Sequence, residues 1–354
     1  MQQYTLGLFS NMFPPGIPKK QNGVILTDTT RGIFVKRMVD DLVQQGVIVK
    51  MAVKKSGSLT GYVPFIYQSL RLVHDRDVDI MQAEYIPHSS MIPALFKRKN
   101  CPLVLKFHGD DARIFPFKNS FFMSVTRTMI RRSDYVLTSS EEIRSILISI
   151  GAVPEKTSTL HSGVDTKFFS PRSRELTRQE LGLPVDATIF LFVGRLHAWK
   201  GLYEILSVAK RCPDETFVFI GPGDIPVHSE NCLFVGSQQP DSVRAWFNAS
   251  DCLLLPTYTE AVPTSVMESF SCEVPAIVTN IGGCPEIVQH GKNGLIIPVR
   301  DIPALYAAVI WMRDHPDERR KMGKQARETV KERYDHTIST DRLIRIHKTL
   351  LDNK

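Results

Sequence analysis

Strand-length apolar runs alternate with helical patterns along the chain, and the alternation occurs twice. Apolar runs lie at residues 4–9, 47–53, 79–82, 103–107 and 135–138, and the pattern restarts at 189–193, 217–220, 233–235, 252–255, 276–278 and 294–297. Between them, apolar residues recur at helical spacing, as in 33–45, 202–211, 241–249 and 303–313. Strands that alternate with helices form parallel sheets covered on both faces, so the sequence predicts two doubly wound α/β domains.

A break near residues 163–174 separates the two series, and 354 residues are ample for two cores. We therefore expect an N-terminal Rossmann-like domain at 1–170 and a C-terminal one at 171–335. The amphipathic segment 341–351, within a final helix at 336–354, is expected to pack back on the N-terminal domain. Ligand crevices of such sheets lie at the carboxyl ends of the strands, so we expect the two crevices to face each other across one cleft.

Composition narrows the class of protein. No stretch reaches the ~18 apolar residues of a membrane span, and the N-terminus lacks a signal-peptide pattern. The six cysteines are dispersed, which favours neither a disulfide framework nor a zinc site and suits a cytoplasmic protein.

Charge is unevenly distributed along the chain. Residues 1–160 hold 21 Lys and Arg against 13 Asp and Glu, whereas the rest holds 23 against 24. A basic N-terminal half favours an anionic partner, either a phosphate-bearing acceptor or an acidic membrane surface, although a solubilising excess explains it equally well. Nucleic acid is not expected, because no basic stripe interleaved with aromatic residues occurs.

Two loops carry the residues of greatest chemical interest. Residues 192–201, FVGRLHAWKG, place Arg195 and Lys200 on a loop after a buried strand, where two cations can stabilise charge on a departing phosphate. Residues 256–268, PTYTEAVPTSVME, follow another strand. Pro263 sits where a helix begins, so the amides that follow it form an anion site by geometry and dipole. Taken alone, each loop also fits ordinary surface residues.

A third segment, residues 274–288, runs from a strand into the turn Gly282-Gly283 and a short helix that begins near Pro285. Together these loops, in this order and spacing, resemble the family-four, or group 1, retaining glycosyltransferases. Residues 133–141 and 162–171 fit the same family. The resemblance implies the GT-B fold, with two Rossmann-like domains facing across a cleft, and transfer of a hexosyl group from a UDP- or GDP-sugar.

The resemblance also implies a role for each matching position. Arg195 and Lys200 grip the donor diphosphate, Glu260 contacts the transferred sugar and Glu268 bonds the ribose. His108, in the segment Lys-Phe-His-Gly-Asp, lies beside the sugar, although a lone histidine at a strand end is more often structural. Further donor-binding positions are Gly32, Gly194, Val262, Thr264 and Ser265.

The chain departs from the family pattern around Pro263. Where the family often has Glu-Gly-Phe-Gly, residues 260–263 read Glu-Ala-Val-Pro. Proline has no amide hydrogen, so one backbone donor to the sugar is missing, which leaves the donor sugar open. Glu273 stands where a glycine is usual, and residues 11–31 lack the usual paired glycines.

The expected chemistry uses no metal and no cofactor beyond the donor, because fixed cations do the work of a divalent ion. The acceptor is expected to be a glycan or a lipid-linked sugar. Three alternatives stay open: an epimerase or a phosphorylase on the same fold, an inactive nucleotide-sugar-binding subunit, and a metal-dependent transferase that uses Asp77-Val78-Asp79, which precedes a strand rather than following one. Residues 121–132 form an amphipathic helix with three arginines, which either covers the sheet or lies on the inner face of an anionic membrane.

Overall fold

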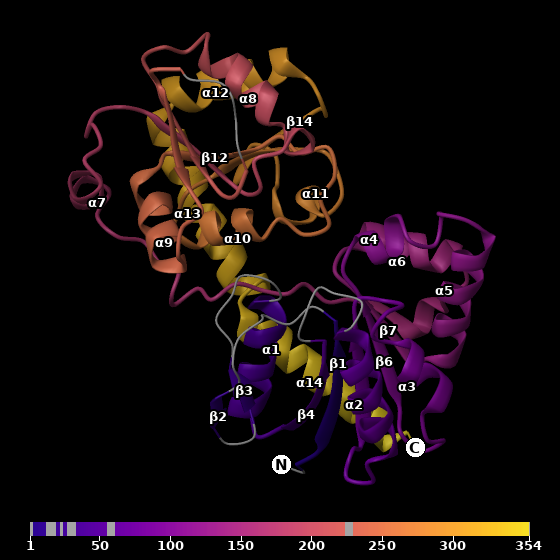
Figure 1. Ribbon diagram of the computed structural model, residues 1–354. Coiled ribbons are helices and arrows are strands. Elements are labelled where there is room, and N and C mark those ends of the chain that lie inside the picture. The colour runs from indigo at the N-terminus through magenta and orange to yellow at the C-terminus, as the bar shows by residue number, and fades with distance from the viewer. Residues whose placement is uncertain are drawn as a thin grey trace. The chain divides into compact units, whose positions relative to one another are not determined.

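The computed structural model describes residues 3–11, 19–21, 24–26, 33–54, 61–223 and 229–353. The chain forms two compact units, Met1–Ser162 with Thr337–Lys354 and Gly163–His336, and each is described by itself (Figure 1).

The first unit contains a six-stranded parallel sheet with the strand order β4-β1-β5-β6-β7-β8. The chain extends this sheet first in one direction and then in the other, so the topological switch point lies between β1 and β5. Its strands are β1 (Thr5–Ser10), β4 (Ile48–Val53), β5 (Ile80–Glu84), β6 (Leu103–Phe107), β7 (Tyr135–Thr138) and β8 (Thr157–Thr159); β2 (Lys19–Gln21) and β3 (Val24–Leu26) form a separate antiparallel pair.

Helices cover both faces of this sheet. On one face, Leu6 and Leu8 of β1 pack with Val39 and Leu42 of α1 and with Leu343 of α14. On the other face, α2 packs on β1 and β4, and its Leu72 lies next to Gly7 of β1. The helices are α1 (Ile33–Gln44), α2 (Tyr62–His74), α3 (Met91–Phe96), α4 (Asp110–Arg113), α5 (Ser120–Arg132), α6 (Glu141–Ser149), the 3-10 turn η2 (Pro154–Lys156) and α14 (His336–Asp352).

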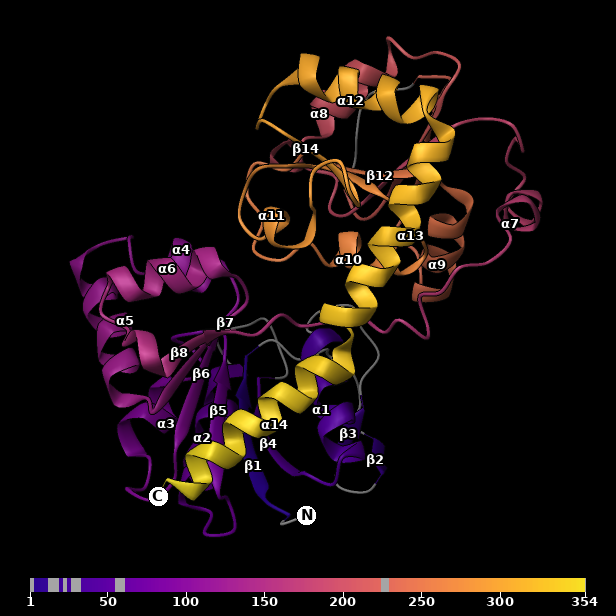
Figure 2. The ribbon, with the colours of Figure 1, turned by 180° about the vertical axis from the view of Figure 1, so that it is seen from behind.

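The C-terminal helix α14 lies across the first sheet (Figure 2). Besides Leu343, its Asp341 accepts a hydrogen bond of 2.7 Å from the amide nitrogen of Gln45, and Thr340 donates one of 3.2 Å to Asp41. Apolar burial and polar contacts together place this end of the chain in the first unit.

The second unit contains a six-stranded parallel sheet with the order β11-β10-β9-β12-β13-β14. The order reverses between β9 and β12, which makes this pair the switch point of a Rossmann-type sheet. The strands are β9 (Ile189–Val193), β10 (Thr216–Ile220), β11 (Cys232–Gly236), β12 (Cys252–Leu255), β13 (Ala276–Thr279) and β14 (Gly294–Ile297). The helices are α7 (Arg174–Glu180), the 3-10 turn η3 (Ala198–Lys200), α8 (Leu202–Ala209), α9 (Pro240–Ala249), α10 (Thr264–Ser271), α11 (Cys284–Ile287), α12 (Ile302–Asp314) and α13 (Pro316–Arg333).

A buried carboxylate fastens two helices to the amino ends of β9 and β12. Asp251 accepts hydrogen bonds from Arg174 at 2.9 Å, Arg178 at 2.6 Å and Arg319 at 3.0 Å, and from the backbone N–H of Ile189 at 2.8 Å. Since a buried charge is tolerated only when it is paired and hydrogen-bonded, this network holds α7 and α13 in register with the sheet. This network occupies the amino ends of the strands, and ligands of such sheets bind at the carboxyl ends.

The units meet along the chain between Ser162 and Gly163, whereas the sequence placed the boundary after residue 170. Val164 and Phe169 belong to the core of the second unit, and Val164 also forms a β-bridge with Asp335. The apolar side of α5, including Met129 and Ile130, is buried in the first unit, where this helix packs beside α3.

Candidate active site

The loop after β9 carries the two predicted cations. Gly194 follows the strand, and Arg195 has an exposed side chain. The chain then forms the turn η3, whose last residue is Lys200, and reaches Gly201 in the left-handed conformation at φ 75°. The loop therefore begins and ends at glycines, with the two cations between them.

Gly201 brings this loop against the end of β12. A Cβ atom at this position would lie 2.1 Å from the carbonyl oxygen of Pro256, so only glycine fits. Next to this contact, the backbone N–H of Tyr258 donates a 2.8 Å hydrogen bond to the carbonyl of Trp199. The two loops that leave β9 and β12 are thus joined through their backbones.

Lys200 and Glu260 form an ion pair across these two loops. The Nζ atom of Lys200 lies 2.6 Å from Oε2 of Glu260, and the side chains are 16% and 14% exposed. Partial burial lowers the local dielectric screening and strengthens the field of such charges. The pair lies at the carboxyl ends of β9 and β12, which is where ligands bind in doubly wound sheets.

Helix α10 begins directly after this pair. Pro263 occupies the position before the first helical residue, one residue earlier than the sequence suggested, and its carbonyl accepts from the N–H groups of Val266 and Met267. The N–H groups of Thr264 and Ser265, the first two residues of α10, have no acceptor one turn earlier within the helix. They make this terminus able to bind an anion. Glu268 lies one turn further on and is half-buried.

The turn after β13 is hydrogen-bonded to the backbone of the loop that carries Glu260. The N–H of Gly283 donates a 3.3 Å hydrogen bond to the carbonyl of Glu260, and the hydroxyl of Thr279 donates one of 2.6 Å to the carbonyl of Thr257. Gly282 adopts a positive φ of 56°, a conformation that glycine takes without strain. The three segments singled out from sequence therefore contact one another in this unit.

The remaining predicted residues are placed as follows. Val262 is half-buried against the core of the second unit, between Glu260 and Pro263. His108 directly follows β6 in the first unit. Gly32 lies outside the described residues. The roles of all these residues in binding and catalysis stay predictions.

His108 lies in a polar cluster at the carboxyl ends of β5 and β6. Its Nε2 atom is 2.5 Å from Oε2 of Glu84, and its ring stacks on Tyr85 with centroids 4.2 Å apart. Burial would raise the pKa of Glu84, but the charge of Lys106 and the hydrogen bond from His108 hold that pKa below its usual range. Glu84 is therefore ionised at neutral pH, although its side chain is only 1% exposed.

Sequence reasoning missed Glu84 and its neighbours. The signal was present: Gln82 and Glu84 lie two residues apart in an otherwise apolar strand, and so share one face of the sheet. Buried polar pairs of this kind are retained only where they are fully hydrogen-bonded.

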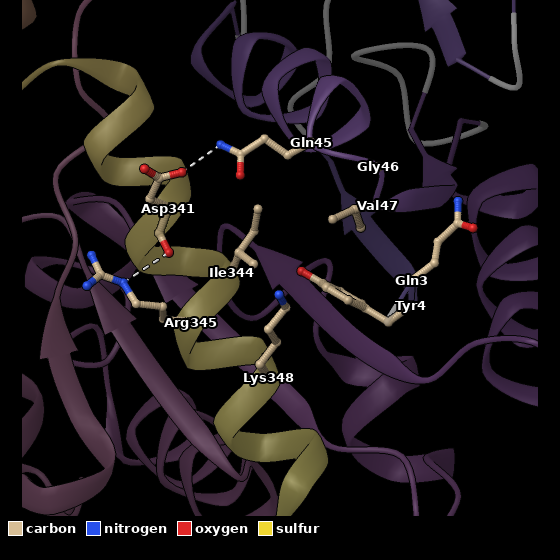
Figure 3. A pocket seen from close by; sticks show the side chains of 9 residues that line it. All are labelled: Gln3, Tyr4, Gln45, Gly46, Val47, Asp341, Ile344, Arg345 and Lys348. Atoms are coloured by element: carbon tan, nitrogen blue, oxygen red, sulfur yellow. Dashed lines mark hydrogen bonds between the residues drawn. The ribbon is translucent and has the colours of Figure 1, made fainter. Parts of the chain in front are cut away.

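Two cavities lie away from these loops. One of about 570 Å³ lies in the first unit beside α14 and the amino end of β1, with Asp341, Arg345 and Lys348 among its lining residues (Figure 3). Another, of about 690 Å³, lies in the second unit between β14, α12 and α13. Among the residues that the structure describes, none of the predicted site residues lines either cavity.

The Asp77-Val78-Asp79 segment lies at the amino end of β5. Asp77 pairs with Lys50 at 3.0 Å, and Asp79 accepts a 2.8 Å hydrogen bond from the backbone N–H of Thr5. These carboxylates thus have structural partners and lie at the end of the sheet opposite His108. Within the part of the chain that the structure describes, no helix combines the length and apolar character needed to cross a bilayer.

Comparison with known proteins gives two family matches. Residues 25–168 match the model of Glycosyltransferase Family 4, and residues 173–329 match that of Glycosyl transferases group 1. A putative teichuronic acid biosynthesis glycosyltransferase of Bacillus subtilis, TuaC, is 25% identical over 274 residues, which cover 75% of this chain and 70% of the relative. The sulfoquinovosyl transferase SQD2 of Arabidopsis thaliana is 27% identical over 268 residues, 71% of this chain but only 52% of the relative.

Solved structures share the fold. Sucrose-phosphate synthase from Thermosynechococcus elongatus superposes with a TM-score of 0.82 at 18% identity, covering 99% of this chain and 100% of that one. HepE of Anabaena, solved in complex with UDP, gives a TM-score of 0.78 at 16% identity, covering 98% and 100%. The family matches to both halves, in chain order and on two parallel α/β sheets, place this chain among the group 1 glycosyltransferases, which have the GT-B fold.

Proposed function

We propose that the chain transfers a hexosyl group from a UDP- or GDP-sugar to a glycan or lipid-linked acceptor, with retention at the anomeric carbon. The observation that carries this proposal is the convergence of the Lys200–Glu260 ion pair and the start of α10 at the switch point of the second sheet. That edge offers fixed positive charge, backbone donors and a carboxylate within one short stretch of surface.

Cleavage of the sugar–diphosphate bond places negative charge on the leaving phosphates. Lys200 and Arg195 meet this charge with side-chain cations, and the Thr264 and Ser265 amides add backbone donors aligned with the helix dipole. The Gly201 and Gly283 contacts fix the backbones of the loops that carry Lys200 and Glu260 before the reaction. Stabilisation therefore needs little reorganisation as the bond breaks.

After the sugar–diphosphate bond breaks, the sugar is transferred to the acceptor hydroxyl. In the proposed retaining reaction, this hydroxyl approaches on the face from which the diphosphate leaves, and a phosphate oxygen takes its proton. Glu260 contacts the sugar, Glu268 bonds the ribose and His108 accepts from a sugar hydroxyl. The fixed cations stand where a divalent ion would, so we propose that no metal takes part.

Pro263 bears on which sugar is transferred. The residue before α10 has no N–H, so the first backbone donors at this terminus belong to Thr264 and Ser265. The protein backbone therefore donates one hydrogen bond fewer to the donor sugar than in relatives that have a glycine at this position. The UDP complex of HepE and the product class in the name of TuaC support a nucleotide-sugar donor and a glycan acceptor.

A two-stage experiment tests the proposal. A thermal-shift screen of UDP- and GDP-sugars identifies the donor, because a ligand that binds the native state raises its melting temperature. The same donor, labelled in the sugar, is then offered with glycan and lipid-linked acceptors in EDTA, and NMR reads the anomeric configuration of the product. An α-linked glycoside from an α-linked donor is expected.

Other products would reject the proposal in distinct ways. An epimerised nucleotide sugar would indicate an epimerase, and a sugar phosphate would indicate a phosphorylase. Binding without transfer to any acceptor would indicate an inactive donor-binding subunit. Loss of activity in EDTA that added Mg²⁺ restores would reject metal independence.

We also propose that the first unit contacts anionic membranes. Phe117, in the loop before α5, and Phe121, in its first turn, are 55% and 67% exposed, and Arg127 and Arg131 of α5 are exposed. Helices that combine exposed apolar side chains with arginines are typical of proteins that bind anionic bilayers. Flotation with vesicles of phosphatidylglycerol, compared with phosphatidylcholine, tests this: equal recovery with both lipids at low salt would reject it.

A further inference from the structure

An unbroken chain of hydrogen bonds runs through the interior of the first unit from α14 to His108. The hydroxyl of Tyr4 lies 2.9 Å from Nδ1 of His347, and Nε2 of His347 lies 2.9 Å from Oε1 of Gln82. The amide nitrogen of Gln82 then donates to Oε1 of Glu84, whose Oε2 faces Nε2 of His108. All of these side chains except that of His108 are buried.

The chemistry of each group fixes the direction of every bond. An ionised Glu84 only accepts, so Gln82 must present its amide nitrogen to Glu84 and its carbonyl oxygen to His347. Nε2 of His347 then carries the hydrogen, and Nδ1 accepts from the Tyr4 hydroxyl. Burial lowers the pKa of His347 to about 3, so its ring is neutral and carries one N–H, as this arrangement needs.

The same reasoning fixes the proton on His108. Oε2 of Glu84 accepts, so Nε2 of His108 must donate, and in the neutral ring Nδ1 is the nitrogen that carries the lone pair. Stacking on Tyr85 and a 2.9 Å hydrogen bond from the His108 backbone N–H to Asp111 hold the ring and its backbone in place. Charged neighbours are Glu84, Lys106 and Asp111.

We infer that Glu84 is a positioning residue, which holds the proton of His108 on Nε2 so that Nδ1 accepts a hydrogen bond from a hydroxyl of the transferred sugar. Gln82 and His347 act through Glu84, because the buried α14 histidine locks the orientation of the Gln82 amide. The inference rests on the proposed function in placing His108 beside the sugar. A buried carboxylate is costly to retain, and a hydrophobic side chain would fill this strand position at lower cost.

The orientation of Gln82 makes the consequence of Glu84→Gln specific. Gln82 still presents its amide nitrogen, so the new side chain must place its carbonyl oxygen toward Gln82 and its amide nitrogen toward His108. His108 then accepts at Nε2, and its neutral ring carries the hydrogen on Nδ1 instead. Exchanging the two side chains, in Gln82→Glu/Glu84→Gln, turns a carbonyl oxygen back toward His108 and restores hydrogen on Nε2.

Imidazole ¹⁵N NMR of the full chain, above the titration range of His108, measures this tautomer without any substrate. We expect Nε2–H in the wild type, Nδ1–H in Glu84→Gln and Nε2–H again in the exchanged variant. Asp41→Asn, which removes another buried carboxylate that contacts α14, should leave the wild-type tautomer unchanged. Nδ1–H in the wild type would overturn the inference even if Glu84→Gln failed to fold.

Transfer kinetics form the second readout. Loss of one hydrogen bond to the sugar predicts a turnover at least about 10-fold lower in Glu84→Gln, largely recovered in the exchanged variant. An unchanged Nε2–H tautomer in Glu84→Gln would overturn the positioning role. An inverted tautomer with wild-type turnover would overturn the contact between His108 and the sugar, whereas failure of the wild type to transfer any sugar would reject the proposed function and leave the tautomer result standing.

Discussion

Replacing Lys200 by Met separates the two effects of its charge, on the stability of the second unit and on transfer. The Lys200–Glu260 pair is 2.6 Å long and each side chain is about one-seventh exposed, so it lies between a surface pair and a buried one. Breaking an exposed pair costs ~0–1 kcal/mol and breaking a buried pair ~3–5 kcal/mol, so we expect Lys200→Met to lower the unfolding free energy by about 2 kcal/mol. For a unit of this size, that lowers the melting temperature by about 4–8 °C.

Lys200→Met should reduce transfer more than it reduces stability, and a second substitution that restores stability should not restore transfer. Loss of one group that stabilises developing charge predicts a turnover at least about 100-fold lower. In Lys200→Met/Glu260→Gln, both charges of the pair are removed, so most of the lost stability should return while turnover stays low. Lys210→Met, at an exposed position at the end of α8, is the matched control and should change neither quantity.

Calorimetric unfolding and donor turnover, measured on the three variants, decide the matter. Turnover that recovers together with stability in the double variant would mean that Lys200 acts only by neutralising Glu260. Wild-type turnover in Lys200→Met would refute the assignment of the donor diphosphate to this loop.

Three further predictions concern the scaffold around the site. Glu273, just after α10, has a φ of 61°, a conformation that costs ~1–2 kcal/mol for a residue other than glycine. Glycine removes this cost but adds an entropy cost of ~0.5–1 kcal/mol, so Glu273→Gly should raise the free energy of unfolding in urea by about 0.5–1 kcal/mol. A lower free energy of unfolding would contradict this. Gly201→Ala should destabilise by about 2–4 kcal/mol, because its Cβ would lie 2.1 Å from the Pro256 carbonyl; unchanged melting would show that the loop yields. The folded-state pKa of His347, about 3, lies below its usual 6.5, so stability is full above pH 6.5 and falls as the pH drops toward 3. Between pH 7.5 and 5.5 the wild type should lose about 1 kcal/mol more than His347→Gln, and parallel urea-unfolding curves would refute the buried, neutral ring.

The strands that are apolar throughout were predictable from the sequence, whereas β8, which reads Thr-Ser-Thr, was not among the expected strands. The run at 252–255 coincides with β12, and that at 189–193 with β9, since no polar residue interrupts either strand. Helix α13 was less predictable: it is polar over most of its length, and it owes its place to buried Arg319 and to Gly323, which packs against the Glu273 carbonyl. Such long-range contacts leave no periodic signal in the sequence.

The candidate site divides in the same way. Lys200 and Glu260 were predictable because each follows a strand end, and residues at the carboxyl ends of neighbouring parallel strands meet at one edge. The chain Tyr4–His347–Gln82–Glu84 was not, because its members are separated by up to 343 positions, and hydrogen-bond partners across such distances cannot be paired from one sequence. Only the polar pair in β5 hinted at it.

The central claim is that a nucleoside diphosphate binds where the loops after β9 and β12 meet. Amide NMR shifts of the ¹⁵N-labelled chain during titration with UDP and with GDP test it most directly. One of the two nucleotides should shift the Lys200, Thr264 and Ser265 amides most strongly and in one saturable step. Shifts confined to the cavity between α12 and α13, or absent from these three residues at saturation, would contradict the account.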